Sequence, residues 1–226
     1  MPAFPLLRPL LILLFAIIAL AAPATAAPPA NRPTPGYVRV RIETSAGPIV
    51  IAADVKHAPK TSANFLAYVD DGRLDDTSFY RSARRRTDPK FGFIQGGIST
   101  DRRRSLPPID HEPTDRTGIR HLDGVISMAR GGDPGSAMGN FFIMIGPVPG
   151  LDARPGKPGY AAFGHVVAGM DVVKRILAMR TGGGVGAMKG QMLQPPVRLI
   201  SARRLDGKPR PTTTIKPWLL NIPGRK

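Results

Sequence analysis

The stretch that decides the fold is YVRVRIET, residues 37–44, which continues through SAG (45–47) into PIVIA (48–52). Apolar and polar side chains alternate along 37–44 with a period of two, as they do in a β-strand that buries one face. The small residues of 45–47 suit a tight turn between two such strands. We therefore expect the folded domain to begin near Tyr37 with a β-hairpin.

Short segments with strand character recur along the rest of the chain. They lie at 77–98, 124–128, 140–145, 160–167 and 197–203. The arginine- and proline-rich stretch 101–120 between them is expected to be a long surface loop. Many short strands with few helices favour an all-β barrel or sandwich over alternating βαβ units.

Two segments have the spacing of an amphipathic helix instead. The first is expected to start with Thr61 or Ser62 as its N-terminal cap and to stop at Gly72. The second is expected from Met170 to about Met179, followed by Gly182–Gly184, which should end it. Both helices would cover the ends of a barrel.

The first 26 residues have the features of a signal peptide. Arg8 supplies a positive charge ahead of the apolar run Leu10–Ala22, and Ala24–Ala26 fits the small-x-small cleavage pattern. The apolar run is shorter than the roughly 20 residues that span a bilayer, which argues against an uncleaved anchor. We expect cleavage after Ala26 or Ala27 and an exported protein, in the periplasm of a bacterium.

The rest of the chain divides into three parts. A flexible linker is expected at 27–36, a single folded domain at 37–206 and a basic, proline-containing tail at 207–226. The apolar cluster Trp218–Leu220 within the tail leaves two alternatives open, docking on the domain or a disordered tail.

Composition excludes several classes of protein. The chain has no cysteine, which rules out a lipid-modified cysteine, a disulfide framework, a thiol nucleophile and any zinc site that uses cysteine. The 32 Lys and Arg against 16 Asp and Glu give a net charge of +16, which attracts polyanions. The four histidines lack metal-ligand spacing and are expected to be surface or strand residues.

A set of motifs occurs in chain order over most of the stretch from Tyr37 to Arg203. They are SFYR (78–81), FIQGG (93–97), VISMAR (125–130), GNFFI (139–143), LD (151–152) and FGHVVAGM (163–170). Together they make the chain resemble the cyclophilins. A single motif of this kind would be weak support, whereas the ordered set is specific.

The resemblance implies a closed antiparallel eight-stranded barrel capped by two helices, with a proline-binding groove on its outer face and neither cofactor nor metal. It also implies peptidyl-prolyl cis–trans isomerase activity. Arg81 is the implied catalytic residue, and Met128 is implied at the core or the edge of the groove. The implied client-binding residues are Phe93, Gln95, Met128, Ala129, Asn140, Phe142, Leu151 and Tyr160.

The chain departs from the family pattern around the pocket. Gly92 stands where the family carries an aromatic residue, so either Phe91 or Phe93 must supply the ring. Asn140 replaces a usual glutamine and Tyr160 replaces a common histidine. These changes affect the shape of the pocket more than the chemistry, because the catalytic arginine is retained.

The chemistry needs few groups. The X–Pro bond rotates over a barrier near ~20 kcal/mol because resonance stiffens it. A catalyst needs an apolar socket for the proline ring and a hydrogen-bond donor for the prolyl nitrogen, which gains a lone pair in the twisted state. Arg81 suits the donor role, since its forked cation is always charged, and an interaction present only in the twisted state accelerates rotation.

Two other functions compete with this one. The first is a cyclophilin-like module that binds proline-containing clients as a chaperone but turns over poorly. The second is a polyanion-binding protein, suggested by 84–86, 102–104 and the tail, although these runs lack stacking aromatic residues. We expect a monomer whose partners are proline-containing polypeptides, with weak contacts to anionic surfaces and no specific nucleic acid.

Overall fold

The computed structural model describes residues 33–220. The expected signal peptide (1–26), most of the expected linker and the last six residues of the tail lie outside the described residues. Within 33–220 no helix has the length and apolar character needed to cross a membrane.

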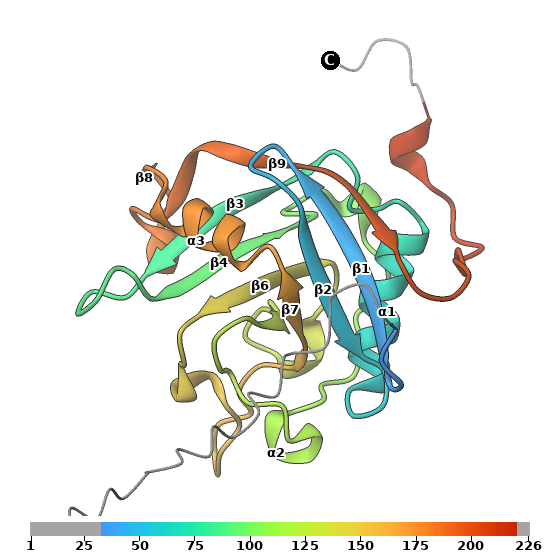
Figure 1. Cartoon of the computed structure of the whole chain (residues 1–226), viewed down its shortest axis with the longest axis horizontal. Helices are drawn as coiled ribbons and strands as arrows, with labels where there is room; N and C mark the ends of the chain where they lie inside the picture. The colour runs from blue at the N-terminus through green and yellow to red at the C-terminus, as the bar shows by residue number, and fades with distance from the viewer. Residues whose placement is uncertain (1–32, 221–226) are drawn as a thin grey trace, which may run out of the picture.

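Antiparallel strands form one closed sheet (Figure 1). The strands are β1 (Tyr37–Thr44), β2 (Ile49–Asp54), β3 (Thr77–Arg84), β4 (Gly92–Gly97), β5 (Val125–Met128), β6 (Asn140–Ile145), β7 (Ala162–Ala168), β8 (Thr181–Gly182) and β9 (Met192–Arg204). Their order is β1-β2-β7-β5-β6-β4-β3-β9, and β9 pairs back with β1 to close the barrel. The short β8 pairs only with β9, so the expected eight-stranded barrel is confirmed.

The helices α1 (Pro59–Asp70) and α3 (Met170–Ala178) lie on opposite sides of the barrel (Figure 1). A third, single-turn helix, α2 (Thr114–Thr117), lies in the long loop 101–120. The buried apolar side of α3 consists of Val172, Val173, Ile176 and Leu177, the set that its spacing in the sequence indicates.

Three details of the sequence interpretation are wrong. Thr61 and Ser62 do not cap α1, because the helix starts at Pro59 and both hydroxyls bond elsewhere, to Glu112 and to the Asp54 carbonyl. α3 covers Met170–Ala178, as its expected bounds indicate, but the glycines at 182–184 do not stop it, because Met179 is already extended. β9 begins at Met192, earlier than expected, although prolines 195 and 196 disfavour a strand there.

Aromatic rings fill the barrel. Phe79 and Phe141 meet edge to face with ring centroids 5.7 Å apart. Phe65 of α1 contacts Phe141 at 5.6 Å and Phe163 at 5.2 Å. All four rings are almost fully buried, so the helix and three strands share one apolar core.

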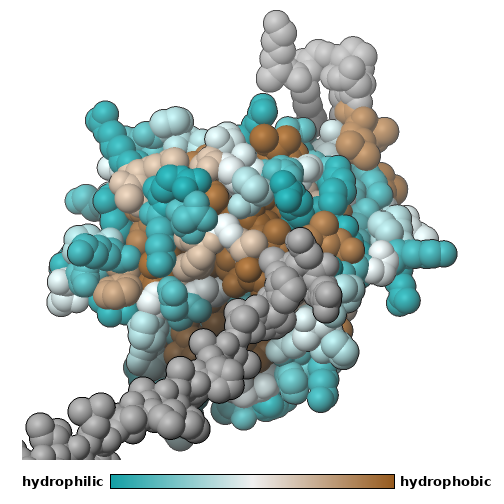
Figure 2. All heavy atoms as spheres, viewed as in Figure 1, coloured by the Kyte–Doolittle hydropathy of each residue, from teal (hydrophilic) through white to brown (hydrophobic). Residues whose placement is uncertain are grey.

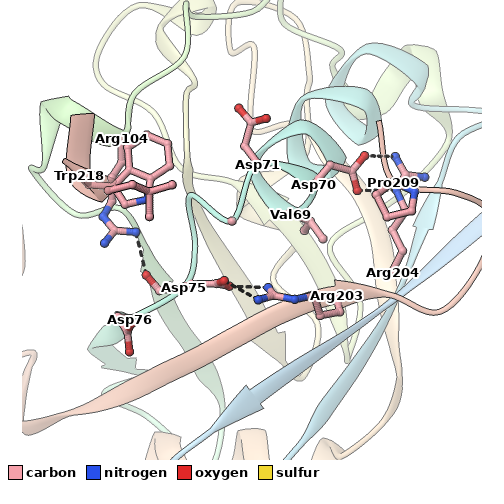
Figure 3. A pocket seen from close by; sticks show the side chains of 12 residues that line it. Val69, Asp70, Asp71, Asp75, Asp76, Arg104, Arg203, Arg204, Pro209 and Trp218 are labelled. Atoms are coloured by element: carbon pink, nitrogen blue, oxygen red, sulfur yellow. Dashed lines mark hydrogen bonds and ion pairs between the residues drawn. The ribbon is translucent and has the colours of Figure 1, made fainter. Parts of the chain in front are cut away.

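Charged side chains cover the outside. Figure 2 shows one face, on which hydrophilic residues surround smaller hydrophobic areas. Several arginines are paired with carboxylates: Arg204 donates to Asp70 at 2.6 Å, and Arg203 donates to Asp75 at 2.6 Å (Figure 3). The Arg203–Asp75 pair is partly exposed, and exposed pairs contribute little to stability individually, whereas the Arg204–Asp70 pair is largely buried.

The described part of the tail docks on the barrel. The Trp218 ring lies over two guanidinium groups, 4.6 Å from the Cζ of Arg73 and 5.4 Å from that of Arg104. Figure 3 shows the indole beside Arg104. Arg73 is fully buried, and its Nη2 has no hydrogen-bond partner among the described residues. Arg73 is already paired with Asp71 through its Nε at 2.7 Å, and the Trp218 ring adds a cation–π contact to this buried guanidinium.

A Trp218→Ala substitution tests this docking. Loss of two cation–π contacts over a buried cation should lower the free energy of unfolding by about 2 kcal/mol, measured by urea denaturation. The matched control is Leu220→Ala, because Leu220 is 61% exposed and should change stability by less than about 0.5 kcal/mol. Equal effects of the two substitutions would contradict docking through Trp218.

Candidate active site

A second apolar cluster lies on the outer face of the barrel, separate from the core. It follows from strand alternation, which sends neighbouring side chains to opposite faces. On β6, Phe141 and Ile143 face the interior, whereas Phe142 and Met144 face outward. The buried members of the outer cluster are Val125, Phe142, Met144 and Ala162, and Phe93, Ile119, Ala129, Val148, Leu151 and Tyr160 pack against them.

Phe142 is the floor of this cluster. Its ring centroid lies 5.2 Å from that of Phe93, and 5.5 Å from that of Tyr160, which it meets edge to face. Leu151 lies in the same cluster, joined to Tyr160 by a hydrogen bond from the Tyr160 N–H to its carbonyl at 3.0 Å. We refer to this outer apolar cluster around Phe142 as the socket, because its aromatic rings offer the kind of apolar surface that suits a proline ring.

The structure decides between the two candidate phenylalanines. Phe93 contacts Phe142 and has the Arg81 guanidinium over its ring, with 5.0 Å between Cζ and the centroid. Phe91 instead packs against Gly146 and lies below the Arg85 guanidinium, outside the socket. Phe93 therefore supplies the ring that Gly92 lacks.

Arg81 lies at the edge of the socket on β3. Its Nη1 donates to Gln95 Oε1 at 2.9 Å, its Nε donates to Gln191 Oε1 at 2.9 Å, and its Nη2 donates to the Ala187 carbonyl at 3.3 Å. Burial lowers the pKa of Arg81, although its guanidinium stays charged at any physiological pH. Three bonds do not use all five N–H donors of an arginine, so donors remain for a bound peptide.

Gln95 holds Arg81 in place. The β3–β4 register sets Arg81 opposite Gln95, and the amide of Gln95 donates to the Tyr80 hydroxyl at 2.8 Å while its oxygen accepts from Arg81. Burial raises the pKa of Tyr80 to about 12, so the hydroxyl stays neutral. Gln95 is thus first a positioning residue. The sequence also predicts that it binds a client, and one N–H of its amide remains for that contact.

The remaining predicted residues fall into three positions. Ala129 packs against the socket, and its N–H donates to the Asn140 carbonyl at 2.9 Å. The Ala129 carbonyl remains available to accept a hydrogen bond from a peptide. The Asn140 side chain bonds the backbone of Ser99 in both directions and so is not directed at Phe142. Met128 does not fit the predicted client-binding role, because its side chain is 2% exposed and packs inside the barrel.

A buried histidine, which sequence reasoning placed on the surface or in a strand, lies directly beneath the socket. The His121 ring stacks on Phe142 at 6.0 Å with an interplanar angle of 12°. Its Nδ1 lies 2.7 Å from Asp152 Oδ1, and its Nε2 lies 3.0 Å from Ser127 Oγ. His121 carries no motif of its own, so its role depends on a side-chain contact that the sequence does not encode locally.

Comparison with known proteins shows the family to which this barrel belongs. The model of the family described as cyclophilin type peptidyl-prolyl cis-trans isomerase/CLD matches residues 39–204. The peptidyl-prolyl cis-trans isomerase cyp18 of Streptomyces antibioticus is 38% identical over 152 residues, which cover 65% of this chain and 87% of that protein. Peptidyl-prolyl cis-trans isomerase A of Dickeya dadantii is 38% identical over 144 residues, covering 63% and 72%.

Solved structures share the fold. A cyclophilin type peptidyl-prolyl cis-trans isomerase of Cryptosporidium parvum, determined in the presence of the dipeptide Ala-Pro, has a TM-score of 0.61 at 20% identity and covers 75% of this chain and 99% of its own. Cyclophilin AquaCyp293 of Hirschia baltica has a TM-score of 0.55 at 22% identity, covering 73% and 72%. The chain belongs to the cyclophilin-type peptidyl-prolyl cis–trans isomerase family.

The buried histidine predicts a pH dependence of stability. Burial lowers the pKa of His121 from 6.5, more strongly than Asp152 raises it. Below pH 6.5 the unfolded chain therefore binds a proton that the folded chain resists, so the free energy of unfolding falls as the pH drops through this value. Urea denaturation at about pH 7.5 and about pH 5.5 should show a smaller fall for His121→Gln than for the wild type. Equal falls would contradict this assignment.

Proposed function

We propose that the enzyme isomerises X–Pro bonds in the outer groove, with Arg81 as the catalytic residue and the Phe142 cluster as the proline socket. The observation that carries this proposal is the position of Arg81, over the Phe93 ring at the edge of the apolar cluster and held by Gln95. A peptide whose proline ring rests on Phe142 brings its prolyl nitrogen to this edge.

Arg81 can stabilise the twisted state selectively. In the planar amide the prolyl nitrogen shares its lone pair with the carbonyl, and rotation returns that pair to nitrogen. A guanidinium N–H can then donate to it, which it cannot do in the ground state, so the interaction lowers the barrier rather than only tightening binding. Because Gln95 and Gln191 already hold the Arg81 guanidinium, the side chain needs little reorganisation when the X–Pro bond twists.

Turnover is better supported than passive binding of clients. A binding module would need the apolar socket but no fixed donor beside it. In this groove Tyr80, Gln95 and Arg81 form a continuous hydrogen-bonded chain that ends at the socket. Such a chain orients a donor, which is what catalysis of rotation requires.

Exported proteins are the proposed clients. This part of the proposal rests on the signal-peptide features of residues 1–26, a positive first segment, an apolar run and a small-x-small site. The absence of cysteine throughout the sequence suits an oxidising compartment, because no thiol is present to be oxidised. The folding of such proteins includes slow X–Pro isomerisation steps that an isomerase accelerates.

Substitution of Arg81 tests the catalytic assignment. Arg81→Ala should lower kcat/KM for an Ala-Pro peptide by two orders of magnitude or more, about 2.7 kcal/mol of transition-state stabilisation. The control is Arg86→Ala, which removes the same charge from an exposed residue outside the groove. The measurement is cis–trans exchange by NMR, and full activity in Arg81→Ala would mean that another donor performs the reaction.

Expression of the full chain in a Gram-negative host tests export. Intact mass of the protein from the periplasmic fraction should correspond to a chain starting at Ala27 or Pro28, since cleavage is expected after Ala26 or Ala27. Ala26→Arg, which places a large charged side chain at the cleavage site, should accumulate as the uncleaved precursor. An uncleaved wild-type chain in the cytosol would contradict the proposal.

A further inference from the structure

A second arginine contacts Tyr160, which together with Phe93 packs against Phe142. Arg130 follows Ala129 directly, and its Cζ lies 4.8 Å from the Tyr160 ring centroid. Tyr160 and Phe93 contact Phe142 separately, and each has an arginine over its outer side. The proline socket is therefore flanked by two guanidinium groups.

Backbone carbonyls hold Arg130 in one position. Its Nε and Nη2 donate to the Gly159 carbonyl at 3.2 and 2.7 Å, and its Nη1 donates to the carbonyls of Gly131 and Gly132 at 2.8 and 3.1 Å. These bonds leave one N–H of the five on an arginine, on Nη2. The side chain is half-buried and already fixed, so a ligand that binds it loses little additional side-chain entropy.

No carboxylate balances either cation within residues 33–220. Every recorded acceptor of Arg81 and Arg130 is a neutral amide or carbonyl oxygen, and neither arginine takes part in an ion pair. Many of the other arginines of the barrel do pair with acids, as Arg203 does with Asp75 and Arg204 with Asp70. Asp152, which follows the socket residue Leu151, is already bound to His121 through the ring and the backbone N–H.

The loop that carries two walls of the socket adds positive charge. Between Leu151 and Tyr160 it exposes Arg154 and Lys157, and neither side chain forms an ion pair with any residue that the structure describes. Like charges along a groove add to a field that attracts the opposite sign. The field around the socket is therefore positive on more than one side.

We propose that Arg130, stacked on Tyr160, forms a carboxylate-binding subsite beside the proline socket, so that the preferred clients are X–Pro segments flanked by Asp or Glu. This inference rests on the proposed function, because it names the substrate class for the same groove. A carboxylate beside Arg130, in the plane of its guanidinium, can accept the free Nη2 N–H in a charge-assisted hydrogen bond. Lys or Arg residues that flank the X–Pro segment are repelled by Arg130 at the same position.

Matched peptides test the subsite. Three peptides share one Ala-Pro core and carry two Glu, two Gln or two Lys on both sides, so that the direction of binding does not matter. Exchange NMR gives kcat/KM for each at about 20 mM salt and at about 500 mM salt. The wild type should prefer the Glu peptide over the Lys peptide by about tenfold or more at low salt, and the preference should shrink at high salt because exposed charges are screened.

Variants assign the preference to Arg130. Arg130→Gln should reduce the Glu-to-Lys ratio by about threefold or more, whereas Arg130→Lys, which keeps the charge, should retain most of it. Arg86→Gln removes the same charge from an exposed residue outside the groove and should leave both the ratio and the basal activity unchanged. A ratio near one in the wild type, or an equal loss in Arg130→Gln and Arg86→Gln, would overturn the subsite.

Binding separates this inference from the proposed function. Titration of the same peptides is followed by the NMR shifts of the Arg130 Nε–H and the Tyr160 ring. If no peptide is isomerised but the Glu peptide alone shifts these signals, the proposed function fails and the subsite stands. If the Gln peptide is isomerised while Glu and Lys peptides bind and turn over equally, the function stands and the subsite fails.

Discussion

Opposite orientation of Phe141 and Phe142 is the constraint on which the site depends. Strand geometry sends these adjacent rings to opposite faces of β6. Phe141 packs against Phe65 and Phe79 in the barrel, while Phe142 forms the floor of the outer groove. Any slip of one residue in the β4–β6 register would exchange the two rings and remove the socket. The stability of the core therefore fixes the geometry of the groove.

The same register brings Arg81, the proposed catalytic donor, to the socket. Gln95 pairs with Phe142 on one side and with Arg81 on the other, so three neighbouring strands carry floor, positioning residue and donor in one row. Tyr80 and Gln191 complete the support of this row with neutral hydrogen bonds. The arginine is thus held without a carboxylate, and its charge remains available to a peptide.

Much of this arrangement could be predicted from the sequence, and the exceptions have physical causes. The strand at 37–44 was predictable with its bounds because its alternation has one clear period. The inward orientation of Met128 was not predictable, because Val125–Met128 are all buried and the sequence shows no alternation that separates the inward from the outward positions. Gln191 and Ala187 reach Arg81 across more than a hundred residues of chain, and local sequence carries no information on such contacts. The ordered motifs bring Arg81 and Phe142 to one side of the barrel because both residues lie in paired strands, whereas Tyr160 precedes β7 and belongs to no motif.

The proposed function requires that the proline of a client lies on Phe142 with its nitrogen beside Arg81. Isotope-filtered NMR of the enzyme with a ¹³C-proline peptide under exchange tests this directly. We expect nuclear Overhauser contacts from the proline ring to the Phe142, Phe93 and Tyr160 rings, and a shift of an Arg81 N–H signal. Proline contacts to other residues, with these three rings unaffected, would contradict it.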